Sequence, residues 1–346
     1  MDEALHPSTL SEILDRTVQI YRQRFLVFVG IAAVPTAAVL VPVCGLVLVA
    51  VWLGASITHL ARNTETALLA GVGILVVAPV WSAVTALATA AMNDAASRGY
   101  VSGERVTIRG AYKEAWRRGW RYVGLYVLEG LLVWVAPIVV WILLAVGGAA
   151  ASVAMRGAGT DALLGIGAFV AAAGLIGYAI WMLLRLSLAF AASVVEEVGV
   201  MAALKRSAAL SKGTKGRIFL LYLLGTVLYY LLMIAVTIPM TIVLALIPGV
   251  NGPQHAQTMA AIVLAVVYGT VFAAQVLIRP VYAIALVLFY YDQRIRQEGF
   301  DIEWMMQRAG LVAPAPALPE AQPWMPAMPI EAAAAQPETP QTEEAV

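Results

Sequence analysis

Residues 162–195 read ALLGIGAFVAAAGLIGYAIWMLLRLSLAFAASVV, an apolar stretch that contains a single charged side chain, Arg185. About 20 apolar residues are enough for an α-helix to cross the ~30 Å hydrocarbon layer of a bilayer. The stretch is continuous rather than alternating, which argues against the strands of a membrane β-barrel. It therefore predicts a membrane-spanning helix, and it raises the question of what an arginine does inside one.

The composition extends this prediction to the whole chain. Of the 346 residues, 61% are hydrophobic and 12% are charged, whereas soluble domains have about 45–50% apolar and about 25% charged residues. The apolar residues gather in six segments, so we expect an all-α polytopic membrane protein with six transmembrane helices arranged as three hairpins. The predicted segments are residues 25–54, 67–92, 122–155, 162–195, 218–248 and 258–291.

The lysines and arginines are distributed unevenly along the chain. Eighteen of the 22 lie before residue 25, in the loops 93–121 and 196–217, or after residue 291, whereas the intervening loops hold only Arg62 and Arg156. Basic loops remain on the cytoplasmic side of a membrane. Both termini are therefore expected in the cytoplasm. The net charge of +1 gives no indication of a nucleic-acid partner.

Each basic segment precedes a predicted hairpin, so the chain reads as three repeated units. The segments are Thr9–Phe25, Thr107–Val123 and Val200–Phe219. Each places apolar and basic side chains on different helical faces, which predicts an interfacial helix with its apolar face toward the acyl chains. Thr9 and Glu12 fit a capping box. The candidates for contact with anionic headgroups are Arg109, Lys113, Arg117, Arg118, Arg121, Lys205, Arg206, Lys212, Lys215 and Arg217.

The predicted organisation has four parts. Residues 1–24 form an N-terminal amphipathic helix, residues 25–291 the transmembrane domain, residues 292–310 a cytoplasmic juxtamembrane segment and residues 311–346 a tail. The tail is rich in proline, alanine and glutamate and has no lysine or arginine. Such a segment cannot bury enough apolar surface to fold alone, so we expect it to be disordered, with a possible protein partner.

Three ionisable residues lie inside predicted transmembrane helices: Glu129, Arg185 and Arg279. A charge at that depth costs several kcal/mol unless it is paired or hydrated, so these side chains should face the interior of the bundle. Two interpretations remain open. Glu129 pairs with one arginine to fix helix packing, or the surplus positive charge holds an anionic group such as a lipid phosphate.

Four acidic residues lie at the cytoplasmic ends of the predicted hairpins: Asp94, Glu196, Glu197 and Asp292. Their position next to the basic segments suggests ion pairs that fix the angle between each interfacial helix and its hairpin. Pairs of this kind contribute up to about 1 kcal/mol each when they are exposed.

Three stretches resemble a bacterial family, the glycerophosphoryl diester phosphodiesterase membrane domain. They are LHPSTLSEILDRTVQIYRQRFLVFVGIAA (Leu5–Ala33), RLSLAFAASVVEEVGVMAALKRSAALSKGTKGRIFLLYLL (Arg185–Leu224) and RPVYAIALVLFYYDQRIRQEGFDIEWM (Arg279–Met305). The resemblance implies a multispanning domain of a bacterial cytoplasmic membrane. In some proteins of that family a soluble phosphodiesterase domain follows, and these 346 residues show no counterpart of it, so no phosphodiesterase activity is implied.

The sequence shows no constellation typical of an enzyme. It has no H-E-x-x-H, G-x-S-x-G, Walker A or dinucleotide-binding motif. Its one cysteine, Cys44, excludes an intramolecular disulfide and a cysteine-based metal cluster. We therefore expect no metal and no cofactor, and a non-enzymatic membrane protein that binds an inner-leaflet anionic lipid or a membrane partner. The alternative is a transporter or scramblase-like protein for an anionic amphiphile.

Overall fold

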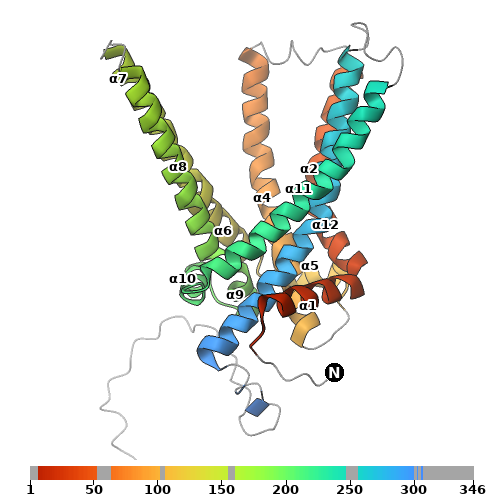
Figure 1. Ribbon diagram of the computed structural model, residues 1–346. Helices are drawn as coiled ribbons and strands as arrows, with labels where there is room; N and C mark the ends of the chain where they lie inside the picture. The colour runs from red at the N-terminus through yellow and green to blue at the C-terminus, as the bar shows by residue number, and fades with distance from the viewer. Residues whose placement is uncertain are drawn as a thin grey trace, which may run out of the picture. The chain divides into compact units, whose positions relative to one another are not determined.

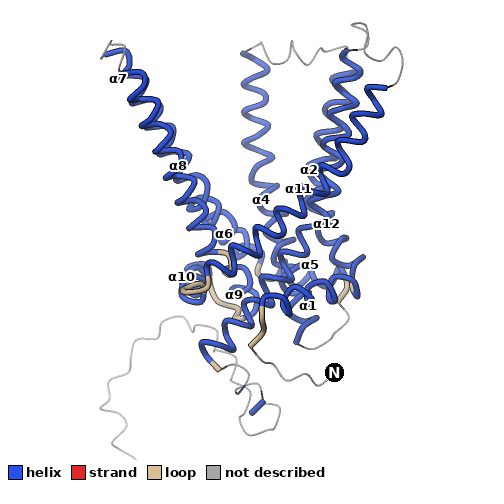
Figure 2. Tube along the Cα trace, viewed as in Figure 1, coloured by secondary structure: helices blue, strands red, loops and turns tan. Residues whose placement is uncertain are grey.

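A computed structural model describes residues 7–52, 64–101, 106–154, 160–246 and 256–299, together with residues 302, 305 and 306. The chain divides into two units, Met1–Glu298 and Gly299–Val346. All regular secondary structure among the described residues is helical (Figure 2), which confirms the all-α prediction. The predicted tail, residues 311–346, lies outside the described residues, as does most of 299–310.

The helices of the first unit are shown in Figure 1. They are α1 (Leu10–Gln23), α2 (Phe25–Trp52), α4 (Thr64–Val101), α5 (Ile108–Arg117), α6 (Gly119–Gly130), the π-helix η1 (Leu131–Val135), α7 (Ala136–Ala154), α8 (Thr160–Leu186), α9 (Ala189–Val195), α10 (Val200–Leu210), α11 (Lys215–Leu246) and α12 (Ala256–Glu298). Among the described residues, four stretches are long and apolar enough to cross a membrane, which agrees with a membrane protein but does not confirm the six predicted spans. They are Gly119–Ala150, Leu164–Val195, Lys215–Val243 and Val266–Glu298.

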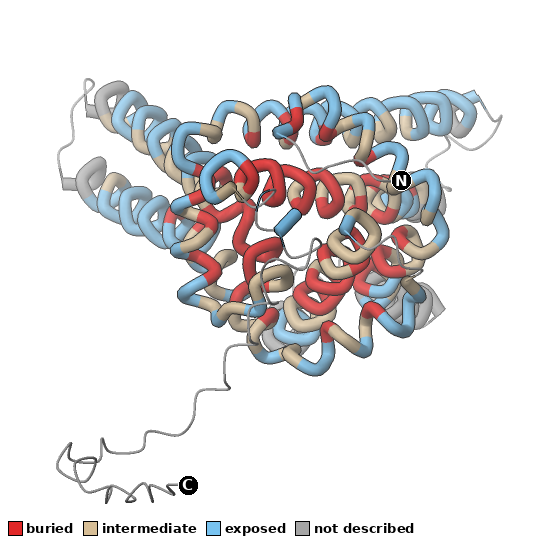
Figure 3. The backbone as a smooth tube through the Cα atoms, turned by 90° about the horizontal axis from the view of Figure 1, so that it is seen from below, coloured by how far each residue is buried: buried red, intermediate tan, exposed pale blue. Residues whose placement is uncertain are grey.

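The core of this unit lies where α4, α9 and α12 meet, and Figure 3 shows its buried residues gathered among more exposed helices. Small side chains of α4 and α9, such as Ala88 and Ala192, are fully buried. Large aromatic side chains of α12 pack against them, with Phe289 and Tyr290 both fully buried. The small residues allow close approach of the helices, and the aromatic rings supply most of the buried apolar area.

Two predicted segments end too early. Helix α4 continues to Val101 rather than residue 92, and α12 continues to Glu298 rather than residue 291. Hydropathy marks where apolar residues stop, but a helix continues when its polar end packs against other elements. The end of α12 contacts α10, where Gln297 Nε2 donates to the Leu210 carbonyl oxygen at 3.1 Å. Asp94 and Asp292 therefore lie within helices rather than at their ends.

The segment predicted at 162–195 is not one helix. It breaks between α8 and α9, at Ser187 and Leu188. The Leu188 N–H donates to the Ser207 hydroxyl of α10 at 3.1 Å, and that hydroxyl donates to the Arg185 carbonyl oxygen at 2.9 Å. A break leaves main-chain groups unpaired, and a buried break needs such partners. The segment predicted at 122–155 also differs, because it begins in α6 and passes through η1.

The three amphipathic segments form helices α1, α5 and α10, and the capping box at α1 is confirmed. The Glu12 N–H donates to Thr9 Oγ1 at 3.3 Å, and the Thr9 N–H donates to Glu12 Oε2 at 2.7 Å. The expectation that their apolar faces meet acyl chains is wrong for the residues at the centre of each face. Ile13, Ala111 and Ala203 are buried against the other helices of the unit. Amphipathicity identifies the buried face but not what covers it.

The Asp292 carboxylate joins three separate parts of the chain. It accepts hydrogen bonds from the Ser8 N–H at 2.8 Å, from Arg217 Nη1 at 3.2 Å and from Arg296 Nε at 3.0 Å. Both arginines also donate to the Ser8 carbonyl oxygen, at 3.0 and 2.8 Å. The side chain of Asp292 is 1% exposed. This buried carboxylate thus fastens the segment before α1, the start of α11 and the end of α12 to one another.

Glu196 and Glu197 also bind basic segments, as predicted. Glu196 accepts from Arg206 Nε at 2.9 Å, and Glu298 accepts from Arg206 Nη2 at 2.6 Å. Glu197 pairs with Arg118, whose hydrogen bond lowers the pKa of the Glu197 carboxyl group. Glu197 also has a left-handed backbone with φ of 57°. Asp94 accepts from Arg98 of its own helix at 2.9 Å.

We predict that Asp292→Asn lowers the free energy of unfolding by about 3 kcal/mol, because Arg217 and Arg296 lose the carboxylate that balances their charges. This value is at the low end of the cost of breaking a buried ion pair, since both arginines are partly exposed to water. Thermal unfolding in detergent and protease cleavage before α1 measure the effect. Asp15→Asn, on an exposed position of α1, is the matched control. An equal effect of both substitutions would contradict the role assigned to Asp292.

Candidate functional site

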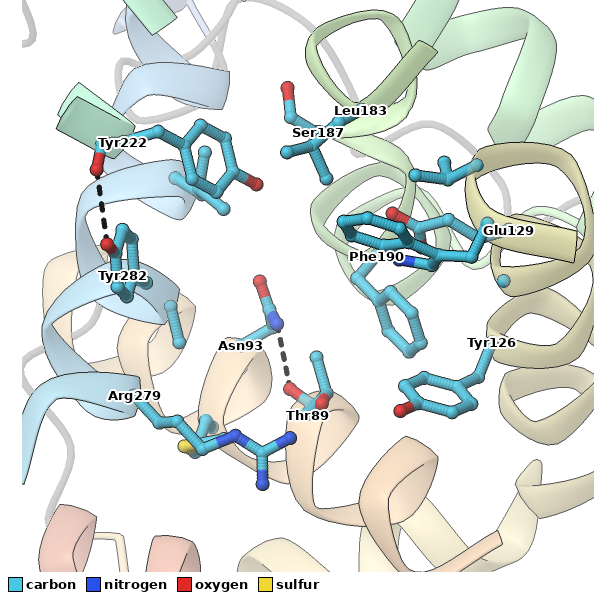
Figure 4. Close-up of a pocket in the computed structure, with 16 residues that line it drawn as sticks. Thr89, Asn93, Tyr126, Glu129, Leu183, Ser187, Phe190, Tyr222, Arg279 and Tyr282 are labelled. Carbon is cyan, nitrogen blue, oxygen red and sulfur yellow. Dashed lines mark hydrogen bonds between the residues drawn. The ribbon is translucent and has the colours of Figure 1, made fainter. Parts of the chain in front are cut away.

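A pocket of about 400 Å³ lies between α4, α6, η1, α8, α9, α11 and α12 (Figure 4). This volume is within the range of about 300–1,000 Å³ that is typical of ligand sites. Most of the lining is apolar or aromatic, with a minority of polar groups, as in many ligand sites. The polar side chains of the lining belong to Thr89, Asn93, Tyr126, Glu129, Ser187, Tyr222, Arg279 and Tyr282.

The wall formed by α11 and α12 is held by hydrogen bonds of Tyr282. Its hydroxyl donates to the Tyr222 carbonyl oxygen at 3.2 Å and lies 3.3 Å from the Thr226 hydroxyl. Gly225 makes this contact possible, because a Cβ atom at that position would overlap the Tyr282 ring. The opposite wall of α4 is fixed by Asn93, whose Nδ2 donates to the Thr89 carbonyl oxygen at 2.7 Å. These bonds hold the polar groups around the pocket in defined positions.

Arg279 brings an unsatisfied donor to the pocket. Its Nη1 atom is buried and has no hydrogen-bond partner in the described part of the chain. A buried donor without an acceptor costs about 1–3 kcal/mol, and more when it is charged. Native proteins usually pair such groups, so this atom indicates a position for a missing acceptor.

Glu129 lines the same pocket from the other side. Figure 4 places it near Phe190, across the pocket from Arg279. Among the described residues no salt bridge joins Glu129 to an arginine. The pairing of Glu129 with an arginine, one of the two interpretations of the sequence, is therefore absent here. The pocket is therefore lined by one arginine and one glutamate that no salt bridge joins in the described part of the chain.

Arg185 is not part of this pocket. Its guanidinium carbon lies 5.1 Å from the centroid of the Trp181 ring, and Lys215 Nζ lies 4.7 Å from the same centroid. Its main-chain oxygen accepts the bonds from Ser207 and Ser211 that support the break after α8. Of the three intramembrane charges predicted from the sequence, the structure brings together only Glu129 and Arg279.

Half of the ten basic residues proposed for the membrane surface have partners within the protein. Arg117 pairs with Glu114, Arg118 with Glu197, Arg206 with Glu196 and Glu298, and Arg217 with Asp292, while Arg121 donates to the carbonyl oxygens of Ser193 and Glu197. Lys215 lies over Trp181. In the described chain no salt bridge involves the other four, Arg109, Lys113, Lys205 and Lys212. These four keep their charges available to the surroundings.

Several pocket residues were not identified from the sequence: Asn93, Tyr126, Tyr222 and Tyr282. Two of them carried a usable signal. Tyr126 is three residues before Glu129, and Tyr282 is three residues after Arg279, a spacing that puts each pair on one helix face. Asn93 and Tyr222 have no such spacing from an intramembrane charged residue. Among the described residues there is also no group of three or more His, Cys, Asp or Glu side chains that could hold a metal ion.

We predict that Ser207→Ala lowers the free energy of unfolding by about 1–3 kcal/mol, because the buried Leu188 N–H loses its acceptor. Ser187 and Phe190 line the pocket on either side of this N–H, so the substitution should also alter the pocket wall. Ser211→Ala is the control, since the Arg185 oxygen keeps its bond from Ser207. Thermal unfolding of both variants tests this, and equal losses would contradict it.

Comparison with known proteins gives one result. A family model described as a family of unknown function (DUF7544) matches residues 99–292, which is more than half of the chain and includes every pocket residue except Thr89, Met92 and Asn93. No curated protein and no solved structure matches the chain. The chain belongs to the DUF7544 family.

Proposed function

We propose that this protein is a non-enzymatic membrane protein that binds the phosphate-bearing headgroup of an inner-leaflet lipid in the pocket of Arg279. The observation that carries the proposal is Arg279, which lines a cavity of about 400 Å³ and has a buried Nη1 atom without a hydrogen-bond partner among the described residues. A guanidinium group binds phosphate through two parallel N–H bonds, which a lysine cannot do. The missing acceptor is thus best supplied by a phosphate oxygen.

The proposal includes a membrane frame. We propose six spans arranged as three hairpins, with α2 and α4 as the first pair, both termini in the cytoplasm and a bacterial cytoplasmic membrane as the location. The four long apolar stretches and the uneven distribution of basic residues support it. In this frame Arg279 lies about 20 Å along α12 from Asp292, within the bilayer.

Other parts of the proposal rest on charge alone. Arg109, Lys113, Lys205 and Lys212 have no salt-bridge partner in the described chain, and they would attract anionic lipids at about 1 kcal/mol per residue near the surface. The C-terminal tail is proposed to bind a protein partner. The resemblance to the glycerophosphoryl diester phosphodiesterase membrane domain stays a prediction.

A transport function for an anionic amphiphile is the second candidate, and η1 favours it. Gly130, Val133 and Trp134, at this π-helix, line the pocket, and π-helical turns inside α-helices occur frequently at functional sites. A helix with such a turn can shift its register by rearranging main-chain bonds. In that case the pocket would be exposed to each leaflet in turn.

We predict that Arg279→Gln lowers the retention of phospholipid by the purified protein about tenfold or more, because a hydrogen bond to a charged group contributes about 1.5–3 kcal/mol. Native mass spectrometry of the full chain in mild detergent measures retention. Arg185→Gln is the matched control, because it removes the other intramembrane arginine without touching the pocket.

Equal retention by the wild type and a folded Arg279→Gln variant would contradict lipid binding at this site. The same variants in proteoliposomes with a fluorescent lipid analogue separate the two candidate functions. Transfer of the analogue between leaflets by the wild type, lost in Arg279→Gln, would support transport over binding alone.

A further inference from the structure

The pocket lining contains one arginine and one glutamate. This combination deepens the proposed function, on which the inference rests. The sequence places two arginines and one glutamate inside the membrane, an excess that favours an anionic ligand. In the structure Arg185 lies over Trp181, outside the pocket lining, so the pocket contains only Arg279 and Glu129. We infer that the pocket selects a zwitterionic phosphoethanolamine headgroup, with the phosphate at Arg279 and the primary ammonium at Glu129.

The separation of the two charges supports a ligand with two charges. Glu129 and Arg279 face one cavity from opposite sides and form no salt bridge with each other (Figure 4). A ligand with a phosphate alone would satisfy Arg279 and leave the carboxylate unpaired, at a cost that is large in a membrane-embedded site. A ligand with both charges satisfies both side chains at once.

The side of the pocket around Glu129 suits an ammonium group. Figure 4 shows Phe190 near Glu129, and Trp134 also belongs to the lining. Aromatic faces attract cations, and a carboxylate accepts hydrogen bonds from a primary ammonium, which has three N–H donors. A quaternary ammonium lacks these donors, and a glycerol headgroup lacks the charge. The combination of carboxylate and aromatic rings therefore favours ethanolamine over choline and glycerol.

The side around Arg279 suits a phosphodiester. Arg279 lines this side of the pocket, its buried Nη1 donor has no hydrogen-bond partner among the described residues, and the hydroxyl group of Tyr126 points toward it (Figure 4). A phosphodiester has a single negative charge, which one guanidinium group balances. A phosphate monoester has a charge near −2 at neutral pH, so part of its negative charge would remain unbalanced by the single guanidinium group.

The pocket also reaches an exposed apolar surface, which favours a lipid over a soluble molecule with the same headgroup. Trp134 lines the pocket, and 57% of its surface is exposed. Most of the neighbouring side chains on α7 are exposed and apolar, among them Ile138, Val139 and Leu143. Acyl chains that remain in the bilayer can lie against this surface while the headgroup occupies the pocket.

The test measures lipid selectivity of the full chain. Delipidated protein in mild detergent is mixed with equal amounts of dioleoyl phosphatidylethanolamine, phosphatidylglycerol and phosphatidylcholine, and bound lipid is identified by native mass spectrometry. We expect the wild type to prefer phosphatidylethanolamine about tenfold over the other two. Glu129→Gln should abolish this preference over phosphatidylglycerol, and Arg279→Gln should weaken binding of all three lipids. Glu114→Gln, in the exposed pair with Arg117 on α5, should match the wild type.

The outcomes separate the inference from the proposed function. A wild-type preference for phosphatidylglycerol, unchanged in Glu129→Gln, would overturn the zwitterionic selection and leave lipid binding at Arg279 intact. If the wild type bound no phospholipid, or bound it no more strongly than Arg279→Gln does, both the zwitterionic selection and lipid binding at Arg279 would be contradicted.

A second measurement needs no variant, in case Glu129→Gln does not fold. Phosphatidylethanolamine with one, two and three N-methyl groups should bind the wild type progressively less, and equal binding of the series would overturn the ammonium site. Soluble glycerophosphoethanolamine is added as a competitor. Displacement of the lipid at equal concentration would overturn the lipid as the source of the headgroup.

Discussion

The buried carboxylate of Asp292 is the constraint on which the arrangement of the first unit depends. It is 1% exposed and binds the main chain before α1 and arginines of α11 and α12. Removing such a carboxylate leaves cations without a counter-charge, which costs far more than the loss of a surface pair. Because α12 is continuous from this point through Arg279, fixing its end also fixes the direction in which Arg279 points.

The separation of Glu129 from Arg279 is informative because the same chain pairs its other carboxylates closely. Glu196, Glu298 and Asp292 all accept hydrogen bonds from arginines at the polar end of α12. A pair held apart across a cavity therefore departs from a pattern that the fold otherwise follows. Departures of this kind, where buried polar groups stay unsatisfied, concentrate at functional sites, because a ligand completes them.

The sequence predicts what depends on local chemistry. The helical class follows from apolar segment length, and the cap of α1 follows from Thr9 and Glu12. The break after α8 could not be predicted, because its support comes from Ser207, nineteen residues after Leu188. For the same reason the sequence names Arg279 and Glu129 as site residues but does not exclude Arg185. Which charges share a cavity depends on helix rotation, and hydropathy does not determine that rotation.

Arg185 illustrates why a charge inside an apolar sequence is not necessarily a buried charge. It lies in the last turn of α8, where the helix ends, and its side chain covers the half-exposed ring of Trp181. Arg279 lies well inside a 43-residue helix, lines the cavity and has a buried Nη1 atom. The two arginines are alike in sequence context, and only one faces the carboxylate across the pocket. In the proposed site, the chemical class of the ligand depends on the side chains of one cavity, and its single arginine and single glutamate are the basis for proposing a zwitterion rather than an anion.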